Sequence, residues 1–270
     1  MQGSSRVAVV AGQEALEQAL SGDVDAGALA EDLFGVTGAL DGNATLRRAL
    51  ADPSRDGSAK GDLVRRLFGG KVGAPATDLL ATLVAQRWAA ERDLADAVEG
   101  FAVQALVMAS ERAGTADDLE DGLFRFERIV AGNAALREAL TDRTGDPQAK
   151  AQVVGALLEG KVSTETLRLA RQAVLAPRGR RFDRTVETYL AVAARRREQL
   201  SATVVSVIDL DEGQRERLSR ALEGIYGKAV HLNVVIDPEV VGGIRIEIGD
   251  EVVDGTILRK LEGARRHFDS

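Results

Sequence analysis

An internal repeat of ninety residues constrains the fold more than any other feature of this chain. Asn43 to Val72 reads NATLRRALADPSRDGSAKGDLVRRLFGGKV, and Asn133 to Val162 reads NAALREALTDRTGDPQAKAQVVGALLEGKV. Fifteen of the thirty aligned positions are identical, and the alignment needs no gap. Solenoid repeats have periods of about 20 to 50 residues, so a period this long indicates one small domain that has been duplicated.

Both copies carry the signals of helices. Apolar residues recur every three or four positions from Leu29 to Leu40, and again from Leu119 to Val130, which predicts one buried stripe on a helix in each copy. Asn43 and Asn133 stand where the N-cap of a following short helix belongs. Gly70 is expected to end a later helix in the first copy, since glycine adopts the left-handed conformation of a C-terminal cap.

A long helix is expected to close each copy. In the first copy Trp88 starts this helix, which ends near Gly114; in the second copy it runs from about Arg180 to Leu200. We interpret Trp88 as a packed side chain, with an anchor in an interface as the alternative.

The sequence changes character after Leu200. The β-branched run from Thr203 to Ile208 predicts a strand. Asp211 with Gln214 three residues later predicts the start of a helix. The apolar side chains expected on the inner face of that helix are Leu218, Leu222 and Ile225.

Further strands are expected near the C-terminus, over His231–Ile236, Ile244–Ile248 and Val252–Val253. In the second of these, isoleucines alternate with charged residues, which is typical of a sheet with one buried face. A final helix is expected from Ile257 to Phe268.

The expected fold class is therefore α+β. Two duplicated all-α helical bundles, over residues 1–115 and 116–200, precede a small α+β domain over residues 201–270 with a short β-sheet and two helices.

Composition excludes several classes of function. The net charge is −7, which argues against a broad nucleic-acid surface. The chain has no cysteine, and this excludes disulfides and thiolate chemistry. No apolar run approaches the roughly 20 residues of a membrane span, and the N-terminus builds no signal-peptide core. We expect a cytoplasmic protein, or one attached to a membrane only through its partners.

Residues that could carry catalysis are scarce. The only histidines are His231 and His267, and neither stands in a motif that would make it a base or a metal ligand. We therefore expect no catalytic residue, no metal and no cofactor. Three consecutive arginines, Arg195, Arg196 and Arg197, form either a solvated helix face or a contact with an acidic partner surface.

Paired glycines near the C-terminus raise the question of a phosphate loop. Gly242 and Gly243 fit neither the dinucleotide-binding nor the P-loop spacing. The segment that follows them is a predicted strand, whereas phosphate binds at the N-terminus of a helix. We interpret these glycines as residues that allow a sharp turn into the sheet.

The same region carries a longer pattern: D-P-x-x-x-G-G, a strand, G-D, a short strand, then D-G-T before an amphipathic helix. Its residues, all interpreted as structural, are Asp237, Pro238, Gly242, Gly243, Gly249, Asp250, Asp254, Gly255 and Thr256. This pattern resembles the C-terminal signature of the delta subunits of F-type ATP synthases, whose mitochondrial counterpart is the oligomycin-sensitivity-conferring protein. The resemblance covers about residues 116 to 270. Ordinary members carry one helical bundle, so this chain resembles a lengthened form.

The resemblance implies a non-catalytic stator subunit. Its helical bundle would bind alpha subunits of the catalytic head, and its α+β domain would bind the b-type subunits of the peripheral stalk. Such a subunit reaches the membrane only through the complex, at the cytoplasmic face of the plasma membrane. The alternative is a helical adaptor with unrelated partners, which would share the repeat but would have no reason to carry the D-P-x-x-x-G-G hairpin.

Overall fold

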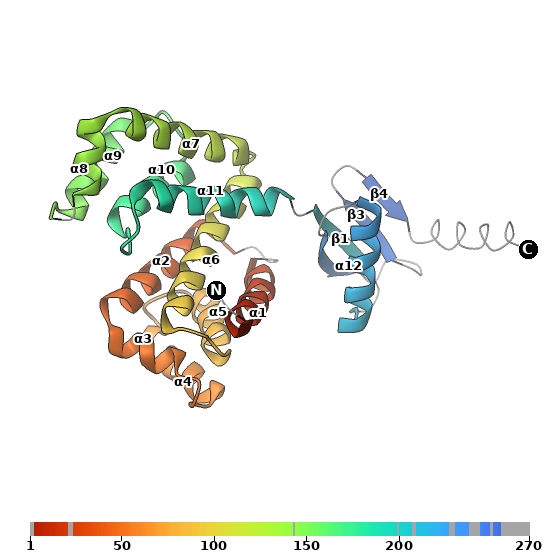
Figure 1. Ribbon diagram of the computed structural model, residues 1–270. Helices are drawn as coiled ribbons and strands as arrows, with labels where there is room; N and C mark the ends of the chain where they lie inside the picture. The colour runs from red at the N-terminus through yellow and green to blue at the C-terminus, as the bar shows by residue number, and fades with distance from the viewer. Residues whose placement is uncertain are drawn as a thin grey trace, which may run out of the picture. The chain divides into compact units, whose positions relative to one another are not determined.

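The protein is mostly helical and holds one small sheet (Figure 1). The computed structural model describes residues 3–20, 24–142, 144–198, 200–206, 209–226, 230–237, 244–248 and 251–254. The chain divides into two compact units, residues 1–193 and 194–270. A mixed α and β class is therefore confirmed at this coarse level.

The first unit is built from helices joined by short connections. Their bounds are α1 Gly3–Leu20, α2 Ala26–Gly42, α3 Ala44–Ala51, α4 Gly57–Phe68, α5 Ala74–Ala85, α6 Glu91–Arg112, α7 Ala116–Gly132, α8 Ala134–Thr141, α9 Pro147–Leu158, α10 Thr164–Leu175 and α11 Phe182–Glu198. Each of α7 to α10 begins and ends ninety residues after its counterpart among α2 to α5.

The predicted helix ends are confirmed where local chemistry sets them. The side chains of Asn43 and Asn133 each accept a hydrogen bond from the backbone N–H three residues later, at 2.9 and 3.0 Å. These bonds satisfy N–H groups that the first turn of a helix leaves without a partner. Gly70 follows the end of α4 with a φ of 77°, the left-handed conformation of a C-terminal cap.

Helix α1 packs against α5 and α6 through one narrow stripe. Its buried residues are spaced by three and four positions, as a helix that buries a single face requires. They are Ser5, Ala8, Gly12, Leu16 and Leu20. A Cβ on Gly12 would lie 2.5 Å from a methyl carbon of Leu83, so only glycine allows this close approach.

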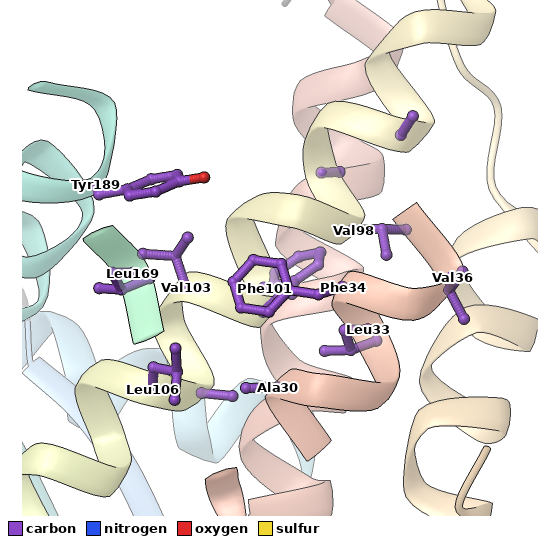
Figure 2. Close-up of a cluster of buried hydrophobic side chains, with 14 of the residues drawn as sticks. Ala30, Leu33, Phe34, Val36, Val98, Phe101, Val103, Leu106, Leu169 and Tyr189 are labelled. Carbon is purple, nitrogen blue, oxygen red and sulfur yellow. The ribbon is translucent and has the colours of Figure 1, made fainter. Parts of the chain in front are cut away.

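The core of the first unit is continuous across the two repeats. Figure 2 shows Phe34 of α2 beside Phe101 of α6, and Leu169 and Tyr189 on the far side of Val103. Helix α6 contacts α1, α2, α3 and α5 on one side of the repeat boundary, and α7 and α10 on the other. Helices from both halves of the unit therefore pack against α6.

The second unit contains a four-stranded sheet in the order β2-β1-β3-β4. The strands are β1 Leu200–Ser206, β2 Val230–Ile236, β3 Ile244–Ile248 and β4 Glu251–Asp254. Strands β1 and β2 are parallel, as a crossover through helix α12 (Glu212–Tyr226) requires. The other two pairings are antiparallel.

Helix α12 covers the sheet and starts as predicted. Asp211 and Gln214 bond each other's backbone N–H reciprocally, at 2.8 and 3.0 Å, which is a capping box. The small core beneath it contains Ala202, Val204, Leu210, Leu222, Val230 and Ile246.

The expectation that Ile225 faces inward is wrong, since it is 65% exposed. Ser219 donates to the carbonyl of Val230, the first residue of β2. Ile225 is six residues further along the helix, a rise of about 9 Å. It therefore lies beyond the N-terminal end of β2, where the sheet no longer covers it.

Two predicted boundaries are also wrong. The first strand begins at Leu200 and not at Thr203, because Leu200 already pairs with Val230 in the parallel ladder. Backbone pairing thus extends the strand beyond its β-branched run, and α11 ends correspondingly earlier, at Glu198. Helix α6 begins at Glu91, so Trp88 precedes it. The predicted final helix, Ile257 to Phe268, lies outside the described residues.

Candidate interaction surfaces

A buried ionic cluster joins the second repeat to the first. Arg178 lies in the loop between α10 and α11, with a left-handed φ of 54° and a side chain that is 3% exposed. Its guanidinium contacts Asp41 of α2, and Asp96 and Glu99 of α6, the last two at 2.9 and 2.7 Å. Burial alone would lower the pKa of Arg178, but the hydrogen bonds to Asp41 and the charge of Glu99 raise it above its ordinary value.

Glu99 is the centre of this cluster. Its carboxylate also accepts from Arg180 and, at 3.1 Å, from the hydroxyl of Tyr189 on α11. Burial, followed by the nearby charge of Glu99, raises the pKa of Tyr189. A buried charge needs this number of partners, because removing it from water is costly unless it is paired and hydrogen-bonded.

A second ionic contact crosses the repeats at α10. Arg168 binds both carboxylate oxygens of Glu31, with the Nη2–Oε2 distance at 2.9 Å. Its guanidinium carbon also lies 4.6 Å from the ring centre of Phe34, within the range of a cation–π interaction. The charged contacts of Arg168 and Arg178 thus hold α10 and its following loop on α2 and α6.

Helices α7 and α9 each expose large apolar side chains. Phe124 is 56% exposed and Ile129 54%, and Val153 and Leu157 on α9 are 42% and 38% exposed. Ile129 and Leu157 line a groove of about 660 Å³ between these helices. Large apolar residues exposed together mark protein-binding surfaces more often than isolated ones do.

Trp88 does not contribute to any exposed surface. Its ring is 5% exposed, and Nε1 donates to the carbonyl of Leu83 at 2.8 Å. The indole therefore packs within the core and holds the connection between α5 and α6 in place.

The three arginines that suggested an acidic partner lie in the last turns of α11. Arg195 is exposed and Arg196 half-buried. Arg197 lies on the same helix, but its side chain is outside the described part.

Few of the signature residues lie in the described part of the chain. The N–H of Asp237 donates to the carbonyl of Ser206 at 2.9 Å and so continues the pairing of β2 with β1. Asp254, the last residue of β4, lies opposite Arg245 of β3 in the backbone ladder of the sheet. The others fall outside the described residues, and they are Pro238, Gly242, Gly243, Gly249, Asp250, Gly255 and Thr256.

The second unit also exposes apolar side chains. Val235 and Ile236 close β2, an edge strand in the order given above, and are 47% and 56% exposed. Ile225 on α12 is exposed as well. An edge strand can extend its hydrogen bonding to another chain.

The described residues hold no cluster of three or more histidine or acidic side chains placed to bind a metal ion. Among the same residues, no helix has the length and hydropathy needed to span a membrane. His231 lies on β2, where it pairs with Ser201, and His267 is outside the described part.

Sequence reasoning missed the residues of the buried cluster, above all Asp41 and Glu99. One signal could have indicated Glu99: an acid placed directly after Val98 and two residues before Phe101, within a largely apolar middle part of the helix. Such an acid is buried only when a cation reaches it.

Helices that expose large apolar side chains, and an edge strand that does the same, are features of a protein that binds other proteins. Comparison with known proteins identifies which kind. The family model described as ATP synthase delta (OSCP) subunit matches residues 98–268. The chain belongs to this family, and it is a non-catalytic subunit of the F-type ATP synthase.

Individual relatives match over nearly the whole chain. A protein named ATP synthase subunit delta from Kineococcus radiotolerans is 48% identical and covers 98% of this chain and 97% of its own. The protein of the same name from Streptomyces avermitilis is 46% identical over 99% and 98% of the two chains. That from Acidothermus cellulolyticus is 41% identical over the full length of both. The lengthened form is thus common to these relatives.

Proposed function

We propose that this chain is a mechanical tether of the ATP synthase stator, with its two ends assigned to different units of the fold. It links the alpha subunits of the catalytic head to the b-type subunits of the peripheral stalk, so that rotor torque drives ATP synthesis. The family match over residues 98–268 carries this proposal. The task requires tight binding at two separate surfaces and no chemistry of its own.

The helical part consists, in this proposal, of two copies of one bundle that share α6. The family match begins at residue 98, inside α6, and so favours α6 as the first helix of the second copy. Its position in that copy would correspond to α1. The five buried residues of α1 support this, because the residues ninety positions later are also buried: Ala95, Val98, Ala102, Leu106 and Ser110. A shared helix replaces the predicted boundary at residue 115.

The second copy is proposed to hold the N-terminal helix of an alpha subunit. It is the copy that the family match covers, and it exposes apolar side chains on α7 and α9 that could bury the stripe of a partner helix. The first copy is the other candidate, since Val7 and Val10 of α1 are 67% and 60% exposed.

A synthetic alpha N-terminal peptide, titrated into the full-length protein, distinguishes the two copies when hydrogen exchange is followed. Slower exchange in α7, α9 or α10 supports the assignment. Protection confined to α1 and α5 would move the site to the first copy.

The second unit is proposed to bind the stalk. Exposed Ile225, Val235 and Ile236 give it apolar contact area, and its core contains no residue of the first unit. Two modest contacts in one molecule reinforce each other through effective concentration.

Truncation tests this division. A chain ending at Glu198 keeps every helix of the first unit and loses the sheet. We expect it to bind the catalytic head and to lose the b-type subunits in pull-down experiments. Stalk binding by the truncated chain would contradict the assignment.

Within the cell the chain is proposed to lie at the cytoplasmic face of the plasma membrane, as a peripheral part of the complex. It should leave the membrane together with the catalytic head when the head is stripped off. Retention on the membrane after complete removal of both head and stalk would contradict this location.

A further inference from the structure

An acidic residue and an exposed aromatic ring stand side by side on the outer face of α7. Asp121 and Phe124 are three residues apart, so they lie on the same face of the helix. The side chain of Asp121 is 71% exposed, and Phe124 is 56% exposed.

The same pair occurs ninety residues earlier, where it is occupied. Glu31 and Phe34 of α2 hold Arg168 of α10: its guanidinium binds both oxygens of Glu31 and stacks over the ring of Phe34. Phe34 itself is 5% exposed and also packs in the core of the first unit, beside Phe101 (Figure 2). Within this molecule, an acid followed three residues later by phenylalanine forms a binding site for arginine.

The ion pair that Asp121 forms within α7 is weak. Arg125, one turn after Asp121, places Nη2 at 3.4 Å from Oδ2, and its side chain is 77% exposed. An exposed pair of this kind contributes little, so an incoming arginine can displace it. In the first copy the matching position is Gly35, and no neighbour on the helix competes with Arg168.

The surroundings indicate what else the ligand must carry. Asp121, Ile129 and Leu157 all line the groove between α7 and α9. Four of the first six residues of α7 are acidic, which favours a basic partner. A partner that offers arginine beside an apolar stripe is an amphipathic helix.

We propose that Asp121 and Phe124 bind an arginine of an amphipathic helix from another ATP synthase subunit, and that the apolar stripe of this helix enters the groove lined by Asp121, Ile129 and Leu157. The inference rests on the proposed function, because that function supplies the neighbouring subunits. The arginine binds Asp121 and covers Phe124, as Arg168 does at Glu31 and Phe34, and the apolar stripe fills the groove.

Crosslinking in the assembled complex identifies the occupant. Benzoylphenylalanine at position 124 of the full-length chain is irradiated in purified ATP synthase, and the adduct is sequenced by mass spectrometry. We expect an adduct with another subunit, within one helical turn of an arginine. An adduct with a second copy of this chain or with lipid, or no adduct although the chain co-purifies with the complex, would overturn the inference. A chain that fails to co-purify would instead overturn the proposed function, and this inference with it.

Charge reversal tests the arginine itself. Binding of the variant chain is measured to ATP synthase from which the native chain has been removed. Asp121→Arg is expected to weaken this binding by at least about tenfold, because it places an arginine against the arginine of the partner. Phe124→Ala removes the stacking and is expected to weaken binding about fivefold. Replacing the arginine found beside the crosslink in the partner subunit with aspartate should restore the affinity of the Asp121→Arg chain for that partner.

The matched control is Asp62→Arg on α4. Asp62 is 68% exposed and pairs with Arg65 at 3.2 Å, much as Asp121 pairs with Arg125. We expect its affinity to stay within about twofold of the unchanged chain. Equal affinities for Asp121→Arg and Asp62→Arg would show that the α7 surface takes no part in binding.

Discussion

Arg178 Nη1 lies 2.7 Å from Glu99 Oε2, and both side chains are only 3% exposed. Arg178 also contacts Asp41 of α2, so its side chain ties the loop after α10 both to α6 and to a helix of the first copy. A charge pair withdrawn from water this far is kept only if each member finds its partners. The packing of the loop between α10 and α11 against α2 and α6 therefore depends on this cluster.

Replacing Arg178 with methionine should destabilise the first unit by about 3 to 5 kcal/mol, because Glu99 then keeps a buried charge without its main partner. Urea unfolding followed by circular dichroism measures the change. Arg184→Met is the control, since Arg184 is 72% exposed and pairs with Glu187 at 2.7 Å; its cost should stay below about 1 kcal/mol. Similar costs for the two variants would contradict a structural role for the cluster.

The hydroxyl of Tyr189 predicts a particular dependence on alkaline pH. Burial and the charge of Glu99 raise its pKa in the folded protein above the ordinary 10.0. The unfolded chain therefore loses this proton near pH 10 while the folded chain keeps it. Stability from this group is present below pH 10 and falls as the pH rises further, by at most about 1.4 kcal/mol per pH unit.

Tyr189→Phe removes the titrating proton and leaves every other group in place. At pH 9 the unchanged chain should have the larger free energy of unfolding. The difference between the two chains should become smaller as the pH rises to 11. Urea unfolding of both chains at each pH gives the difference. A constant difference over this range would mean that the hydroxyl titrates normally in the folded state.

Features set by neighbours along the chain could be predicted from the sequence. The Asn43 and Asn133 caps and the capping box at Asp211 form between residues three apart. Their chemistry is complete within one helical turn, so the pattern of residues is enough to place them.

Features that depend on distant partners could not be predicted. Arg178 is separated from Asp41 by 137 residues, and nothing near either one announces the other. Leu200 is a strand residue because Val230 lies beside it, although its own neighbours favour the helix before it. Phe34 and Phe124 occupy the same place in the repeat, yet Phe34 is 5% exposed and Phe124 56%. Phe34 is covered by Phe101 of α6 and Arg168 of α10, which lie far from it in the sequence (Figure 2).

Gly12 predicts an asymmetry between two glycines in helices. A Cβ on Gly12 would lie 2.5 Å from Leu83 and 2.6 Å from Phe101, so Gly12→Ala should cost about 1 to 3 kcal/mol through overpacking of α1. A Cβ on Gly38 of α2 would meet nothing within 4 Å, and Gly38→Ala should gain up to about 1 kcal/mol of helix propensity. Melting temperatures of the two variants should move in opposite directions.

The small core of the second unit makes its stability depend on single side chains. Leu222, on the inner face of α12, is 2% exposed. Leu222→Ala should cost about 2 to 5 kcal/mol of stability. Ile225, on the same helix but 65% exposed, should cost less than about 0.5 kcal/mol when changed to alanine.

Hydrogen exchange separates the effect on the two units. In Leu222→Ala the amides of β1 and β2 should exchange faster while those of α6 stay protected, because the two cores share no residue. The same variant should lose the b-type subunits and keep the catalytic head. Faster exchange throughout α6 would mean that the units unfold together, and the assignment of one partner to each would then lose its physical basis.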